Sequence, residues 1–99
     1  MLTIDEIKKK FSPIFTANNV KQAILFGSHA THTARPVSDI DVVVDVDEEI
    51  DALDFFGMKA ELENSFNMPV DLIAKFEIQP ASKIDCEIKE KGILIYGET

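Results

Sequence analysis

Two aspartates open an apolar run in the middle of the chain. Asp39 and Asp41 stand at the start of residues 39–46, a valine-rich segment that favours a β-strand. Residues two apart in a strand project from the same face, which puts these Cβ atoms roughly 7 Å apart on one side. Carboxylates that share a side in this way are ligands suited to Mg²⁺. The pair therefore marks a candidate divalent-cation site at a strand entrance.

A third acid heads a later apolar segment. Asp71 lies near the start of residues 70–74, which predict another strand. Two carboxylates about 4 Å apart repel by about 4 kcal/mol at an effective dielectric of about 20. A folded chain brings three acids together only where another interaction offsets this repulsion. A bound Mg²⁺ ion does so, because it makes the electrostatic energy of the site favourable. Two such ions, roughly 3.5–4 Å apart, can hold a triphosphate and activate an attacking hydroxyl.

Gly27 and Ser28 supply a second kind of chemistry. They follow the apolar run 23–26, where a strand gives way to a predicted short helix. Backbone N–H groups at such a junction can bind a phosphate. A phosphate cradle beside a carboxylate pair indicates a metal-bound nucleoside triphosphate as the ligand.

The remaining candidates are cations and imidazoles near these motifs. Arg35 and Lys75 could each neutralise triphosphate charge, although a surface role is the alternative for both. His29 and His32 are interpreted as exposed loop residues, because two ligands do not make a closed zinc site.

The pattern Gly-Ser, ten residues, then Asp-x-Asp resembles the signature of the nucleotidyltransferase superfamily built like the DNA polymerase β palm, and in particular its minimal, single-domain branch. The resemblance covers about residues 20–75, and the run 38–41 also fits it. Members often carry Arg-Gly where this chain has Thr31 and His32, but the two-acid core is intact.

The resemblance implies a role for each motif residue. Asp39 and Asp41 would bind both Mg²⁺ ions, and Asp71 would bind the catalytic ion and help to deprotonate the acceptor. The nucleotide would be held by Gly27, Ser28, Ser38 and Arg35. The implied reaction is attack on the α-phosphorus of ATP, which yields a nucleoside monophosphate ester and pyrophosphate.

The resemblance also implies a partner. The minimal branch is commonly paired with a small helical protein of the HEPN type, and acts as an antitoxin that transfers AMP from ATP to a tyrosine of that toxin. Two alternatives remain open: an antitoxin that neutralises its partner by binding with little or no catalysis, and the catalytic subunit of a small-molecule nucleotidyltransferase.

Composition limits the other classes. The chain of 99 residues is expected to form a single domain, residues 1–99. Its net charge of −8 shows no basic face, so we expect no direct nucleic-acid binding. The single Cys86 suits a reducing compartment, and no apolar run approaches the ~20 residues that span a bilayer. A cytoplasmic location without membrane attachment is the expectation.

The elements that must position these residues alternate between helix and strand. Thr3 and Glu6 form a predicted capping box, and Gly92 is expected to end the last helix. The helix over 52–66 is expected to bury Leu53 and Phe56 together with Met58 or Ala60 and, in part, Leu62. The predicted helices are 3–18, 52–66 and 81–91; the predicted strands are 20–26, 39–46 and 70–74, with 93–96 as a short closing strand or a docked tail.

The chemistry also predicts how the strands pair. The end of strand 20–26 meets the start of strand 39–46 only if the two are antiparallel. Asp41 and Asp71 each lie near the start of a strand. They become neighbours only if these two strands are parallel and joined by a crossover helix. The expected fold class is therefore α/β (α+β), with a mixed sheet of three to four strands flanked by helices, the nucleotidyltransferase fold.

Overall fold

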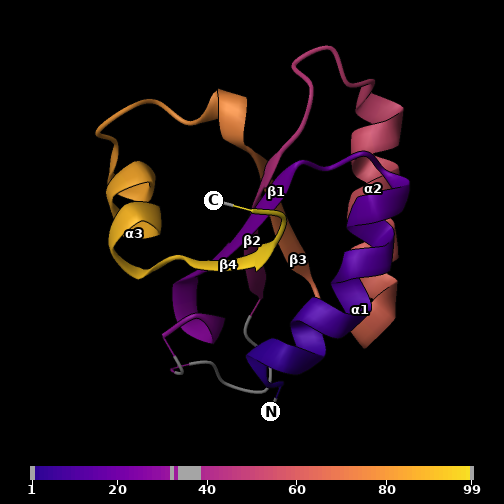
Figure 1. The fold of residues 1–99 in the computed structure, drawn as a ribbon, viewed down its shortest axis with the longest axis horizontal. Coiled ribbons are helices and arrows are strands. Elements are labelled where there is room, and N and C mark those ends of the chain that lie inside the picture. Colours follow the sequence, from indigo (N-terminus) through magenta and orange to yellow (C-terminus); the bar gives the residue numbers. More distant parts are fainter. Residues whose placement is uncertain (1, 32, 34–38, 99) are drawn as a thin grey trace.

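The computed structural model describes residues 2–31, 33 and 39–98. These residues form one four-stranded sheet with the order β3-β2-β1-β4 and three α-helices (Figure 1). The elements in chain order are α1 (Ile4–Ala17), β1 (Gln22–Phe26), the 3₁₀ turn η1 (Gly27–His29), β2 (Ile40–Asp45), α2 (Ala52–Phe66), β3 (Val70–Ala74), the 3₁₀ turn η2 (Lys75–Glu77), α3 (Lys83–Lys91) and β4 (Ile93–Tyr96).

The sheet is mixed, as the sequence predicts. β1 runs antiparallel to β2 and to β4, whereas β2 and β3 are parallel. Residues 93–96 are thus a strand, and the alternative of a docked tail is wrong. The predicted bounds of the helix over 52–66 and of the strand over 70–74 match α2 and β3 to the residue.

The two faces of the sheet are covered differently. Figure 1 shows α1 and α2 side by side against one face, with α3 on the other side of the sheet. The core fills the space beneath α1 and α2, where alternate strand residues such as Leu25, Val42 and Leu72 are buried. The intervening residues, among them Asp41 and Asp71, therefore lie on the side where α3 packs.

Local signals explain where the helices begin. Thr3 and Glu6 form the predicted capping box, in which the Glu6 N–H donates to Thr3 Oγ1 at 3.1 Å and the Thr3 N–H donates to Glu6 Oε1 at 3.3 Å. Asp51 caps α2 by accepting from the Leu53 N–H at 3.0 Å. No helix in the described ranges has both the length and the apolarity to cross a membrane.

One prediction about α2 is wrong in detail. Met58 and Leu62 are fully buried, but Leu53 is 81% exposed and Phe56 is 62% exposed. α2 carries apolar residues on two opposite sides at helical spacing, and only one side can face the sheet. Phe76 is also exposed, and so is Cys86, which lies on a helix surface rather than in the core.

Candidate active site

The two strand-borne acids are direct neighbours in the sheet. Asp41 of β2 is paired with Asp71 of β3 in the parallel register, and residues paired in this way project from the same face about 4.8 Å apart between strands. Asp39, which is exposed, lies two residues before Asp41 and immediately ahead of β2. The parallel pairing thus brings the third acid beside the first two.

Gly27 closes the other side of Asp41. Phe26, the last residue of β1, is paired with Asp41, so the chain turns into η1 directly beside that carboxylate. Gly27 has φ +73°, a left-handed conformation that favours glycine. A Cβ at this position would lie 3.1 Å from Asp41 Cγ and would overlap Oδ2. Glycine is therefore required both by the backbone conformation and by the approach of the carboxylate.

The turn after Gly27 is held by backbone and hydroxyl contacts. The Ala30 and Thr31 N–H groups donate to the Gly27 carbonyl at 3.1 and 3.2 Å, and the Thr31 hydroxyl donates to the same carbonyl at 3.3 Å. The Thr33 N–H donates to the Ser28 carbonyl at 2.9 Å. Thr31, which replaces the arginine common in the resembled branch, therefore stabilises the turn that presents Gly27 and Ser28.

The electrostatics of the acids centre on Asp41. Burial raises the pKa of Asp41 from 3.8 to about 6, and repulsion from the Asp71, Asp39 and Glu87 carboxylates acts in the same direction. A bound cation would favour the charged carboxylate and offset this repulsion. The electrostatics of the three acids therefore favour binding of a cation.

Comparison with known proteins agrees with this geometry. The family model described as polymerase beta, nucleotidyltransferase, matches residues 9–99, which is nearly the whole chain. The chain belongs to the polymerase beta nucleotidyltransferase family. It is an enzyme of the nucleotidyltransferase class.

Individual relatives support the assignment. A provisionally named protein adenylyltransferase of Methanocaldococcus jannaschii, MJ0435, is 38% identical over 82 residues, which cover 83% of this chain and 88% of that protein. A toxin–antitoxin crystal structure with AMP-PNP superposes with a TM-score of 0.77 at 23% identity, covering 93% of this chain and 74% of that one. A complex of the tri-AMPylated Shewanella oneidensis HEPN toxin with its MNT antitoxin gives a TM-score of 0.71 at 20% identity, covering 97% and 74%. At these identities the two structures show a shared fold.

The three acids of this nucleotidyltransferase are suitable Mg²⁺ ligands, although their side chains are not arranged as a complete metal site. Within the residues that the structure describes, no three His, Cys, Asp or Glu side chains are grouped as a finished metal site. The donor set is nevertheless all-carboxylate, which is the ligand type that Mg²⁺ prefers. The mutual repulsion at Asp41 is the cost that a cation would remove.

Several predicted residues are placed elsewhere or lie outside the description. Arg35, Ser38 and His32 are outside the described residues, so their predicted positions are untested. His29 is 6% exposed and buried in η1, so the interpretation of an exposed loop residue is wrong for it. Lys75 begins η2, directly after the end of β3, whereas Asp71 lies near the start of that strand. Lys75 is therefore far from the acids, which argues against a role in binding phosphate.

Among the described residues, Glu87 contributes to the electrostatics of the site without any indication from the sequence. It lies on α3, and its carboxylate acts on the pKa of Asp41. Glu87 is brought there because β4 pairs with β1, so the preceding helix returns across β1 on the side where Asp41 projects. No spacing within 83–91 signals that position.

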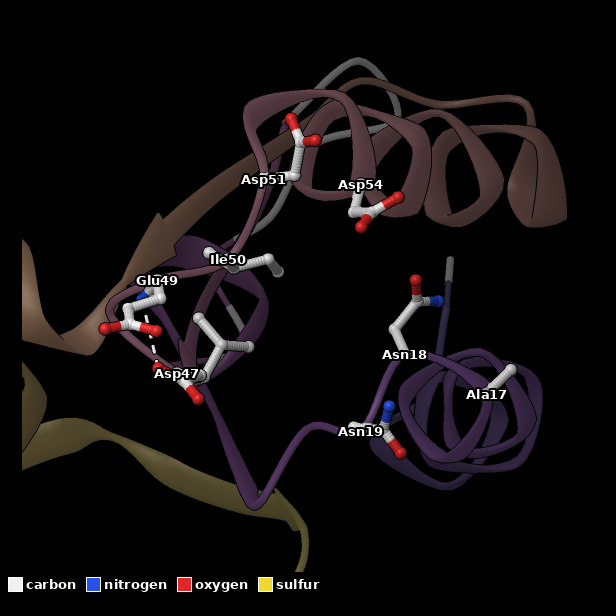
Figure 2. Close-up of a pocket in the computed structure, with 9 residues that line it drawn as sticks. Ala17, Asn18, Asn19, Asp47, Glu49, Ile50, Asp51 and Asp54 are labelled. Carbon is white, nitrogen blue, oxygen red and sulfur yellow. Dashed lines mark hydrogen bonds between the residues drawn. The ribbon is translucent and has the colours of Figure 1, made fainter.

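A hollow of about 620 Å³ lies at the other end of β2. Figure 2 shows it between the end of α1 and the start of α2, with Asp51 and Asp54 on one side and Asn18 and Asn19 on the other. The residues after β2 line its floor, whereas Asp41 stands near the start of that strand. This acidic hollow is therefore separate from the candidate active site.

Proposed function

We propose that this nucleotidyltransferase is an antitoxin that transfers AMP from ATP to a tyrosine of a HEPN-type toxin. The observation that carries the proposal is the pairing of Asp41 with Asp71 beside Gly27, because it puts a carboxylate pair next to the turn whose backbone N–H groups could bind a phosphate. The adenylyltransferase name of the M. jannaschii relative and the toxin–antitoxin complexes of the same fold support the acceptor class.

In this proposal each residue takes the role that the family resemblance implies. Asp39 and Asp41 would hold Mg²⁺, with Asp71 as a further ligand. Bound Mg²⁺ supplies charge neutralisation of the triphosphate and of the leaving pyrophosphate. Gly27 and Ser28 would bind the β- and γ-phosphates through N–H groups and the serine hydroxyl, and Ser38 and Arg35 would add contacts to the nucleotide.

In the proposed reaction, one bond to the α-phosphorus forms and another bond to it breaks. The tyrosine oxygen of the partner attacks the α-phosphorus of ATP, and the bond from that phosphorus to the bridging oxygen breaks. Pyrophosphate leaves with the electron pair, and Asp71 accepts the tyrosine proton. The products are an AMP ester of tyrosine and pyrophosphate.

Mass spectrometry tests the proposal. A purified HEPN-type toxin is incubated with the chain, ATP and Mg²⁺, and the modified residue is located by peptide fragmentation. We expect the partner to gain the mass of AMP on a tyrosine, and to gain nothing with the variant Asp39→Ala plus Asp41→Ala. A partner that binds the wild-type chain but gains no AMP would refute the transfer.

A second candidate function is neutralisation by binding alone. Thr31 favours it, because its neutral side chain, which donates to the Gly27 carbonyl, stands where the resembled branch often has an arginine that can contact phosphate. The same double variant separates the two functions. Neutralisation of the toxin that survives Asp39→Ala plus Asp41→Ala supports binding, and loss of neutralisation supports transfer.

A further inference from the structure

The outer side of α2 carries an apolar stripe that nothing in the described chain covers. Leu53 is 81% exposed and Phe56 is 62% exposed, and Gly57 and Ala60 beside them are exposed as well. At 3.6 residues per turn these four positions fall within an arc of about 100°, on the side opposite the buried Met58 and Leu62. Single exposed apolar residues are ordinary, but an aligned set on one helix face indicates a contact surface.

Gly57 has no role within the folded chain that the structure reveals. A Cβ at this position would meet nothing within 4 Å, and Gly57 does not adopt a positive φ. Glycine in the middle of a helix weakens that helix relative to alanine. Because Gly57 has no side chain, it leaves a depression in the stripe, where the backbone of another helix can approach closely.

One residue of the stripe, Phe56, has a ring contact within the folded chain. The Phe56 ring stands edge-on to the Phe55 ring, with centroids 5.9 Å apart at an interplanar angle of 85°. Phe55 is itself packed against the core. Phe56 is therefore held at the surface, so a partner would lose little conformational freedom by packing on it.

Acidic side chains border the stripe. Residues 47–63 contain seven acids and a single lysine, so they hold most of the chain's net charge of −8. Asp54 and Glu61 lie along the edge of the stripe nearest α1, where Asn18 Nδ2 donates to Glu61 Oε1 at 3.5 Å. Asp51 and Asp54 also line the acidic hollow of Figure 2, which adjoins the start of the stripe.

We propose that the stripe formed by Leu53, Phe56, Gly57 and Ala60 is the docking surface for the toxin partner, through an apolar helix edge bordered by lysine or arginine side chains. The acidic border is complementary to a basic partner. A second copy of this chain is disfavoured, because a symmetric contact would set acids against acids. The identity of the partner rests on the proposed function, whereas the surface rests on the geometry of α2.

The position of this surface has a consequence for catalysis. α2 covers the face of the sheet opposite the one from which Asp41 and Asp71 project. A partner subunit docked on α2 therefore leaves the nucleotide site open and lies on the far side from it. For AMP transfer, the acceptor tyrosine must therefore lie on a part of the partner that does not contact α2.

Isothermal titration calorimetry with the purified HEPN-type protein tests the proposal. Leu53→Ser plus Phe56→Ser should weaken binding more than about tenfold. The matched control Phe76→Ser removes an exposed phenylalanine elsewhere and should change the affinity less than about twofold. Gly57→Leu adds bulk into open space, so circular dichroism should show an intact fold while binding falls more than about tenfold.

The charge component is measured through salt dependence. Asp54→Asn plus Glu61→Gln should weaken binding at low salt and flatten its dependence on salt concentration. Unchanged affinity in both the double serine variant and Gly57→Leu would overturn the docking surface. So would light scattering that shows a homodimer of the wild-type chain abolished by these changes.

The same titrations distinguish the two proposals. Wild-type binding that the α2 changes reduce, without AMP gained by the partner, overturns the transfer function and retains the docking surface. If AMP is transferred but the α2 changes leave binding unaltered, the docking surface is overturned and the transfer function is retained. Absence of wild-type binding overturns both.

Discussion

Gly27 lies so close to Asp41 that no side chain fits between them. The overlap of a Cβ with Asp41 Oδ2 couples the turn after β1 to the acid of β2, although the two residues are 14 positions apart in the chain. Any larger residue at 27 must displace the carboxylate that stands at the centre of the candidate active site.

Gly27→Ala should therefore impair activity more than it impairs folding. The positive φ costs roughly 1–2 kcal/mol for a residue with a Cβ, and the displaced Asp41 should lower AMP transfer by about 100-fold or more. The control is Gly97→Ala, since Gly97 has φ +84° and its Cβ would meet the Lys21 carbonyl. Gly97→Ala should lower the thermal midpoint similarly and leave AMP transfer nearly unchanged; equal losses of transfer in both variants would contradict this account.

The raised pKa of Asp41 predicts a pH-dependent stability. A carboxyl whose pKa is about 6 when folded and 3.8 when unfolded destabilises the fold progressively as pH rises between these values. The full shift corresponds to about 3 kcal/mol, and partial exposure to solvent reduces the expected effect to about 1 kcal/mol. Asp41→Asn should thus be more stable than the wild type at pH 7 without Mg²⁺, and this difference should shrink toward pH 4.

Denaturant titration at pH 4, 5, 6 and 7 measures this difference. Added Mg²⁺ should stabilise the wild type at pH 7 and should stabilise Asp41→Asn much less. A stability difference between the two proteins that stays constant from pH 4 to 7 would mean that Asp41 titrates normally.

Gly57→Ala should stabilise the isolated chain. The substitution improves helix propensity by about 1 kcal/mol, and the new Cβ meets open space. Gly92→Ala is the contrasting variant, because its Cβ would approach the Ile24 side chain at 2.7 Å and collide with the Ile88 carbonyl. Urea unfolding should give a higher midpoint for Gly57→Ala and a lower one for Gly92→Ala; a loss of stability at Gly57 would show an unrecognised constraint on α2.

Much of the fold follows from the chemistry read in the sequence. The mixed sheet was predicted because three acids and a Gly-Ser turn can meet only if β2 is antiparallel to β1 and parallel to β3, and both pairings are confirmed. Alternation of helix and strand alone would have predicted an all-parallel sheet. The motif thus carried topological information that local propensity lacks.

The errors have a common physical origin in contacts made far along the chain. Leu53, Phe56 and Ala60 have the same helical spacing as Phe55, Met58 and Leu62, so periodicity alone cannot choose which side of α2 faces the sheet. The burial of His29 and the approach of Glu87 to Asp41 likewise depend on the packing of η1 and α3, which no nearby residue encodes.

Titration of the chain with ATP, with and without Mg²⁺, tests the central claim most directly. Calorimetry should show ATP binding that requires Mg²⁺ and that falls more than about tenfold in Asp41→Asn and in Asp71→Asn. ATP binding that is equally strong without Mg²⁺, or that both variants retain in full, would contradict the account.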